Sequence, residues 1–288
     1  MKKYILILIV QLSFANAWAQ NEGRVGVFTT ISKTTLLNKD DKAWGDYLPT
    51  FKPALGLTAG YHFTLFKALP IGISAQASYS TTGQNYNGTY EDSTSYYAYS
   101  RLRYFRVGGA LHFGSNPRRL VSLAMSVGAT YGFLTSYQDR YELVRYNNER
   151  LIVDVKNSDV TFYDTSVVKG SLNNPLYKKT DFNIFGTLGL DILISQNIVF
   201  GFGTRYDMGL GGVENGVNVN INYETTPPSS TPYTLQNLKV KYRGPIDPNV
   251  KRAETTNNAI GAYFSFRLRI FNKEKVEFWY KEHRWDEK

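Results

Sequence analysis

The stretch LVSLAMSVGATYGF, residues 120–133, decides the fold. Its odd positions from 121 carry Val, Leu, Met, Val, Ala, Tyr and Phe, whereas its even positions from 122 carry Ser, Ala, Ser, Gly, Thr and Gly. A period of two residues is typical of a β-strand whose two faces meet different surroundings. Residues 120–133 are therefore predicted to form a strand with one apolar face and one face of small or polar side chains.

The same alternation recurs on both sides of this stretch, in residues 24–32, 54–65, 71–80, 101–113, 181–195, 198–210 and 259–271. A soluble β-sandwich would alternate in the same way, with its apolar faces turned inward. The length of the segments favours a membrane barrel, because a tilted strand needs ~9–11 residues to cross a bilayer and sandwich strands usually have ~5–6. The sequence therefore predicts an all-β fold, an eight-stranded antiparallel up-and-down transmembrane β-barrel with long extracellular loops.

The polar faces and the aromatic residues support the same fold. Gly, Ser and Thr dominate the polar faces, as suits a narrow barrel that its own side chains fill. Aromatic residues lie near the ends of the apolar faces, where a membrane barrel has its interfacial girdles. They are Tyr61, Phe63, Tyr79, Phe105, Phe113, Tyr131, Phe133, Phe200 and Phe264.

The connections alternate between short and long. Residues 66–70, 114–119 and 196–197 are short, whereas residues 33–50, 81–100, 134–180 and 211–258 are long and polar. Outer-membrane barrels have short periplasmic turns and long external loops, so both termini are predicted to be periplasmic. A count of ten strands is the alternative, because residues 141–145 and 151–155 resemble a hairpin. Their many charges favour a position above the membrane.

The N-terminus and the composition indicate an exported protein. Lys2 and Lys3 precede an apolar run, and Ala17-Trp18-Ala19 resembles a cleavage site, so residues 1–19 are predicted to be a signal peptide. The formal net charge is +9, but the basic residues are scattered, which disfavours nucleic-acid binding. Lipid phosphates and lipopolysaccharide are the expected partners of this charge. The absence of cysteine excludes disulfides and zinc-thiolate sites.

Charged residues on the polar faces are the candidate functional residues. By parity, these face the lumen: Arg106, Asp191, Arg205, Asp207, Arg267 and Arg269. Unpaired charges are costly in a narrow interior, so Arg205 and Arg267 are expected to bridge the two aspartates in a structural network. A selectivity ring in a pore is the alternative.

Two histidines are the other residues that could carry chemistry. His62 and His112 share inward parity near the periplasmic rim, where Ser74 and Ser122 could accompany them. Bonding of the two rings to neighbouring hydroxyls is favoured over a metal pair or a hydrolase site. The Gly201-x-Gly203 spacing lies within a predicted strand and so does not indicate a nucleotide site. No catalytic, cofactor-binding or metal residue is predicted.

Two stretches resemble a known family. Residues 73–83, ISAQASYSTTG, are similar to the third-strand signature of the PorT-like family of small outer-membrane β-barrels. Residues 205–210, RYDMGL, resemble the Arg-Tyr-x-x-Gly-Leu motif of its penultimate strand. The resemblance covers about positions 23 to 271 and implies an eight-stranded, porin-like outer-membrane barrel. Some relatives serve a protein-secretion machine.

The sequence therefore predicts three regions and a non-catalytic function. After the signal peptide, residues 20–271 form the barrel and residues 272–288 a periplasmic tail. The barrel is expected to act as a scaffold whose external loops contact a ligand or an envelope protein partner. A small pore or an accessory subunit of a secretion machine is the alternative.

Overall fold

The structure is a computed structural model of the chain. It describes residues 22–37, 46–48, 50–65, 69–90, 94–114, 120–144, 150–163, 167–215, 221–224 and 254–270. The predicted signal peptide, residues 1–19, and the predicted tail, residues 272–288, lie outside these ranges. Within them, no helix is long and apolar enough to cross a membrane.

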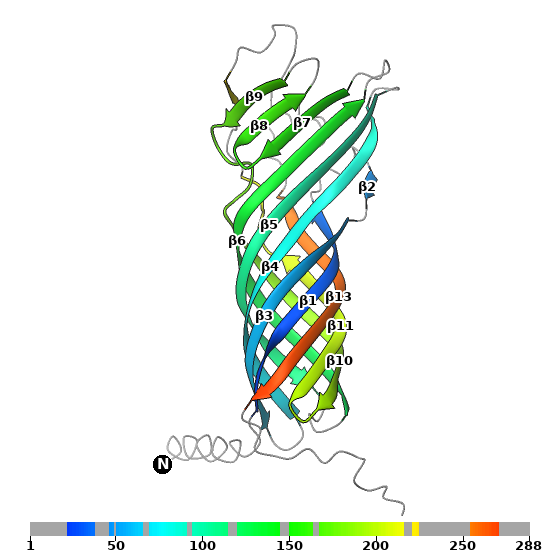
Figure 1. Cartoon of the computed structure of the whole chain (residues 1–288), viewed down its shortest axis with the longest axis vertical. Coiled ribbons are helices and arrows are strands. Elements are labelled where there is room, and N and C mark those ends of the chain that lie inside the picture. Colours follow the sequence, from blue (N-terminus) through cyan, green and yellow to red (C-terminus); the bar gives the residue numbers. More distant parts are fainter. Residues whose placement is uncertain are drawn as a thin grey trace, which may run out of the picture.

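Eight antiparallel strands of the described residues close into a ring, as the sequence predicts (Figure 1). In ring order they are β1 (Glu22–Leu37), β3 (Thr50–Leu65), β4 (Leu69–Tyr90), β5 (Thr94–Gly114), β6 (Val121–Val144), β10 (Thr180–Ser195), β11 (Ile198–Gly209) and β13 (Thr256–Ile270). The register of β1 against β13 runs from Gly23 opposite Ile270 to Leu37 opposite Thr256, and this pairing closes the barrel. The barrel strands therefore leave no open edge, and the wall has an inside and an outside.

The outside of the ring is apolar and the inside polar. Large apolar side chains are exposed on every ring strand, among them Leu57 at 64% and Val127 at 60%. Polar and charged side chains such as Thr130 and Arg205 are buried in the interior. This is the reverse of a soluble protein and is the arrangement of a transmembrane β-barrel, whose strands alternate apolar-out and polar-in.

An exposed row of aromatic side chains crosses four neighbouring strands. Tyr79 on β4 lies opposite Phe105 on β5, which lies opposite Phe133 on β6. On β10, Phe182 lies opposite Tyr131 of β6 and continues the row. All five rings are exposed on the outer face, where interfacial aromatic residues of a membrane barrel belong.

Where the structure describes the expected long loops, they are for the most part strands that continue above the ring. β4, β5 and β6 extend through residues 81–90, 94–100 and 134–144, and β6 continues the sheet into β7 (Arg150–Lys156), β8 (Asp159–Tyr163) and β9 (Val167–Leu172) (Figure 1). β12 (Ile221–Tyr223) pairs with β9, and β2 (Asp46–Leu48) with β4. The predicted hairpin of residues 141–145 and 151–155 pairs as β6 and β7 and is not part of the ring. The ring of eight strands is therefore confirmed, and the described parts of the long connections are largely folded as strands above it.

The upper extensions of β4, β5 and β6, together with β7, β8, β9 and β12, are called here the outer sheet. The outer sheet has a hydrophobic core of its own. Its buried side chains include Leu102, Tyr137, Val153, Phe162 and Tyr177. A bulge explains why alternation alone did not predict it: Arg103 pairs with Ser136 and Tyr104 with Leu134, so Thr135 is an extra residue in β6. The extra residue changes which parity of β6 faces inward, and the regular pattern of the barrel stops there.

The two faces of β6 can be tested by substitution. Met125 and Val127 are exposed at mid-strand, whereas Ser126 is buried and bonds Thr187 on the neighbouring strand at 2.5 Å. Replacing Met125 or Val127 with Arg should block assembly, because an arginine on the lipid face at mid-bilayer costs about 2–4 kcal/mol. Ser126→Thr, the control, should assemble. Heat-modifiable migration of membrane fractions measures this, and normal insertion of both Arg variants would contradict the assigned faces.

Candidate functional site: the charged lumen

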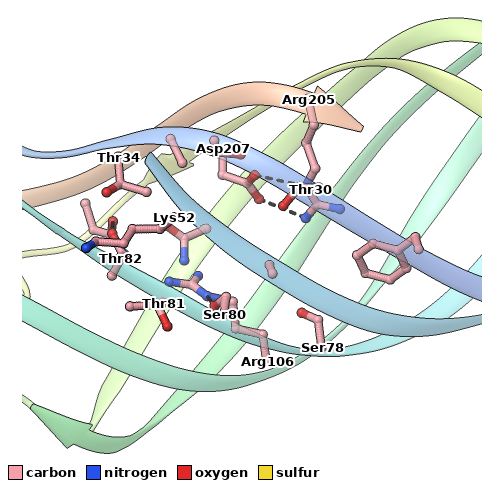
Figure 2. A pocket seen from close by; sticks show the side chains of 16 residues that line it. Thr30, Thr34, Lys52, Ser78, Ser80, Thr81, Thr82, Arg106, Arg205 and Asp207 are labelled. Carbon is pink, nitrogen blue, oxygen red and sulfur yellow. Dashed lines mark hydrogen bonds and ion pairs between the residues drawn. The ribbon is translucent and has the colours of Figure 1, made fainter. Parts of the chain in front are cut away.

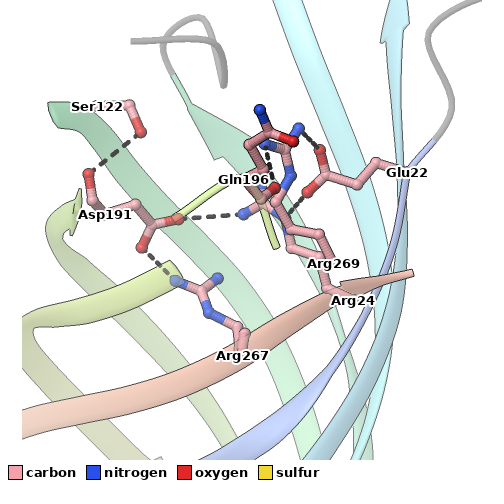
Figure 3. Close-up of polar contacts among 7 residues, drawn as sticks. All are labelled: Glu22, Arg24, Ser122, Asp191, Gln196, Arg267 and Arg269. Atoms are coloured by element: carbon pink, nitrogen blue, oxygen red, sulfur yellow. Dashed lines mark hydrogen bonds and ion pairs between the residues drawn. The ribbon is translucent and has the colours of Figure 1, made fainter. Parts of the chain in front are cut away.

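Five charged side chains form one group at the end of the lumen where β1 begins and β13 ends (Figure 3). Asp191 on β10 accepts hydrogen bonds from Arg267 on β13 and, at 3.2 Å, from Arg24 on β1. Glu22 accepts one from Arg24 at 2.5 Å and another from Arg269. Each residue is no more than 8% exposed. The group, called here the lower cluster, links three strands through buried ion pairs.

A glycine makes room for the lower cluster. A Cβ atom on Gly201 of β11 would lie 2.7 Å from Nη2 of Arg267 and 2.9 Å from Oδ1 of Asp191. β11 separates β10 from β13, so the ion pair of Asp191 and Arg267 spans an entire strand. The absence of a side chain at position 201 lets the two charged groups meet over the backbone.

A second group lies farther along the lumen. Arg205 donates to both carboxylate oxygens of Asp207, at 2.9 and 2.8 Å, and to Gln76 at 3.4 Å. Its guanidinium carbon lies 3.9 Å from the centre of the Phe185 ring and 5.7 Å from that of Phe28. The bidentate pair and the aromatic stacking fix the plane of the guanidinium group across the lumen.

A third group surrounds Asp181. Arg106 donates to this carboxylate at 2.8 Å, and Asn183 and Asn257 donate to it at 2.9 and 3.1 Å. Thr82 in turn donates to the side-chain oxygen of Asn257 at 2.5 Å. Arg106 also donates to Ser80 at 3.0 Å, so the group connects β4, β5, β10 and β13.

The six residues singled out in the sequence all contribute to these groups, but they do not form the single network that was expected. Arg267 binds Asp191 and Arg205 binds Asp207, in two separate groups, so no described ion pair bridges the two aspartates. Sequence reasoning missed Glu22, Arg24 and Asp181. The inward parity of Arg24 beside Val25 would have identified it, whereas Glu22 precedes the first alternating segment and Asp181 begins another.

The two histidines lie together without a metal site around them. The ring centres of His62 and His112 are 5.2 Å apart, and Nε2 of His112 lies 2.7 Å from the hydroxyl of Ser74. Among the described residues no group of three or more His, Cys, Asp or Glu side chains could hold a metal ion. Both carboxylate oxygens of Asp191 bind arginines. The aspartate is therefore engaged elsewhere and does not complete a Ser-His-Asp triad.

A polar cavity of about 50 Å³ lies between the second and third groups (Figure 2). Its hydroxyls come from Thr30, Ser32, Thr34, Ser78, Ser80, Thr81 and Thr82. Lys52, Arg106, Arg205 and Asp207 add charge to the lining. Such a lining can hold water or a small polar solute. The lower cluster closes the lumen beneath it.

The lower cluster yields a prediction for stability. Asp191→Asn leaves Arg24 and Arg267 buried without their shared carboxylate, and should lower the free energy of unfolding by about 3–5 kcal/mol. Glu142→Gln is the matched control, because Glu142 also lies near two arginines, Arg140 at 3.8 Å and Arg150 at 3.6 Å, but in a more exposed setting. The control should cost less than about 1 kcal/mol. Urea unfolding of vesicle-inserted protein measures both, and equal losses would contradict the account.

Compared by sequence, the chain matches no family model and no curated protein. Several solved structures are similar in strand arrangement. A major outer membrane protein from Thermus thermophilus has 10% identity and a TM-score of 0.38, covering 86% of this chain and 99% of that one. Ail of Yersinia pestis, crystallised with a heparin analogue, has 10% identity and a TM-score of 0.33, with 87% and 99% covered. Neisserial surface protein A has 9% identity and a TM-score of 0.32, with 86% and 97% covered.

Proposed function

We propose that the protein is an integral outer-membrane protein of a Gram-negative bacterium, a structural and binding scaffold without catalytic activity. The apolar exterior supports insertion into a bilayer, since exposed Leu57 and Val127 would otherwise face water. The interior supports a scaffold, because an eight-stranded barrel is just wide enough for its own side chains to fill. Buried ion pairs at three levels occupy it.

The outer sheet is the observation that carries the binding role. It stands on β4, β5 and β6 and has a packed core that includes Tyr104, Val160 and Phe162. A core makes the sheet rigid, and a rigid surface loses little conformational entropy when a partner binds. Its outward face presents side chains such as Lys156, Tyr163 and Lys169, all exposed. The extended connections thus offer a preformed contact surface on the barrel.

The two ends of the barrel differ, and this difference supports an orientation. Glu22, Ile270 and the turn at residues 196–197 lie at one end, and the outer sheet rises from the other (Figure 1). Outer-membrane barrels expose their longer connections to the outside. The proposed orientation therefore has the outer sheet on the cell surface and both chain termini in the periplasm.

The PorT-like resemblance is part of this proposal. The first motif lies on β4 and the second on β11, and Gln76 and Arg205 join them by a hydrogen bond of 3.4 Å within the lumen. Residues shared with a family for structural reasons would make contacts of this kind. Membership would also allow the second role, that of an accessory subunit of a protein-secretion machine.

A small pore is the competing function, and the polar cavity is the observation that favours it. The hydroxyl-lined space around Lys52 would admit water and ions from one side. Passage would then require an opening through the lower cluster, where Arg24, Asp191 and Arg267 meet. Separating those buried charges is costly, so the scaffold is the better supported function.

Surface labelling tests the orientation. The chain contains no cysteine, so a single introduced thiol gives an unambiguous signal. A membrane-impermeant maleimide should label Asp159→Cys, the exposed first residue of β8, on intact cells. It should label Asn197→Cys, at the exposed turn between β10 and β11, only after the outer membrane is permeabilised. The reverse pattern would place the outer sheet in the periplasm.

Conductance separates the scaffold from the pore. Wild-type protein in planar bilayers should keep the current near its baseline, and Arg267→Ala should lower thermal stability without adding a conducting state. A pore predicts a measurable wild-type current that changes in Arg267→Ala at unaltered stability. That second result would replace the scaffold by the pore as the assigned function.

A further inference from the structure

Basic side chains lie directly above the exposed aromatic row on two sides of β6. On β5, Arg103 is exposed and points outward like Phe105, and it lies two residues closer to the outer sheet. Lys178 and Lys179 are exposed and immediately precede β10, whose exposed Phe182 belongs to the row. These three residues, Arg103, Lys178 and Lys179, are called here the basic rim.

The bulge in β6 brings the two halves of the basic rim to one level. Thr135 donates its hydroxyl to the carbonyl oxygen of Arg103 at 3.0 Å. The neighbouring amide of Leu134 donates to the carbonyl oxygen of Lys179 at 2.8 Å. Arg103 and Lys179 therefore flank the same point of β6, about 10 Å apart across two strand spacings. A single lipid headgroup can reach both halves.

The charge of the basic rim is not neutralised within the described part of the chain. No ion pair joins its three residues to a described carboxylate, whereas every described arginine buried in the lumen has one. The aspartates of the adjoining segments face inward, where Asp139 bonds Tyr177 and Asp181 bonds Arg106. The rim therefore presents uncompensated positive charge just outside the apolar belt, the level at which lipid phosphates lie in a bilayer.

We propose that the basic rim binds the phosphate groups of the lipid in the outer leaflet around the barrel. Arginine contacts phosphate oxygens through two parallel N–H donors, and lysine supplies a mobile point charge beside it. The aromatic row below, Phe105, Phe133 and Phe182, contacts the upper acyl chains of the same lipid. The inference rests on the membrane insertion proposed above and adds a specific lipid-binding surface to it.

The experiment compares two lipids that differ only in phosphate. Full-length protein is folded into phosphatidylcholine vesicles that contain either phosphorylated lipid A or the same lipid with its phosphates removed. Native mass spectrometry after mild detergent extraction then measures the lipid that each protein retains. Wild-type protein should retain more phosphorylated lipid A than dephosphorylated lipid A.

The triple variant Arg103→Gln/Lys178→Gln/Lys179→Gln should lose this preference, by on the order of fivefold for each charge removed. The pair Lys178→Gln/Lys179→Gln, which leaves every ring strand untouched, should lose part of it and covers the case in which the triple variant misfolds. The control Arg150→Gln/Lys156→Gln/Lys169→Gln removes the same charge from the outer sheet far above the row, and should keep the preference.

Three results would overturn the proposal. They are an equal retention of both lipids by wild type, an undiminished preference in the folded rim variants, and an equal loss in the control, which would assign the effect to net charge. Wild-type protein that does not enter vesicles at all would instead refute the proposed membrane insertion, together with the lipid surface that rests on it.

Discussion

Backbone pairing between the first and last ring strands is the interaction on which the rest of the structure depends. β1 and β13 are paired from Gly23 and Ile270 to Leu37 and Thr256, and without this ladder both strands would expose unpaired N–H and C=O groups. Such groups are costly in a lipid environment, so a β-barrel can span a bilayer only when its first and last strands are paired. Closure also fixes the diameter. Eight strands leave space for side chains only, and every inward residue must therefore suit its neighbours across the lumen.

The sequence predicts the ring because its signal is local. In β6 the alternation from Val121 to Phe133 indicates which residues lie on the apolar outer face, without any knowledge of contacts with other strands. The same signal stops at Thr135, where the bulge inserts one residue and Tyr137 and Tyr141 turn into a core. The alternation of the barrel therefore does not continue in phase into the outer sheet, of which the sequence indicates only the hairpin of residues 141–145 and 151–155. The buried residues of that sheet alternate again, as Val153 and Val155 do on β7 and Val160 and Phe162 on β8, but these strands are short and their packing against distant strands makes the core.

Partners in the lumen are predictable only where they are close in sequence or in the sheet. Arg205 and Asp207 are two residues apart on one strand, so their pairing follows from parity alone. Arg24 and Asp191 are 167 residues apart and on strands that are not neighbours, and their contact depends on how far the strands are staggered around the barrel. Asp191 and Arg267 meet only because Gly201 between them has no side chain. A glycine in an alternating pattern does not by itself indicate which charges will meet over it.

β6 is part of both the barrel wall and the outer sheet, and this gives the molecule a mechanical property. Its lower half pairs with β5 and β10 in the barrel, and its upper half pairs with β5 and β7 in the outer sheet, with one bulge between them. β6 is one continuous strand from Val121 to Val144. A pull on the outer sheet along β6 is therefore carried in shear by many ladder hydrogen bonds that rupture together, rather than one at a time as in peeling. A force applied to the outer sheet is therefore transmitted through β6 directly to the barrel wall.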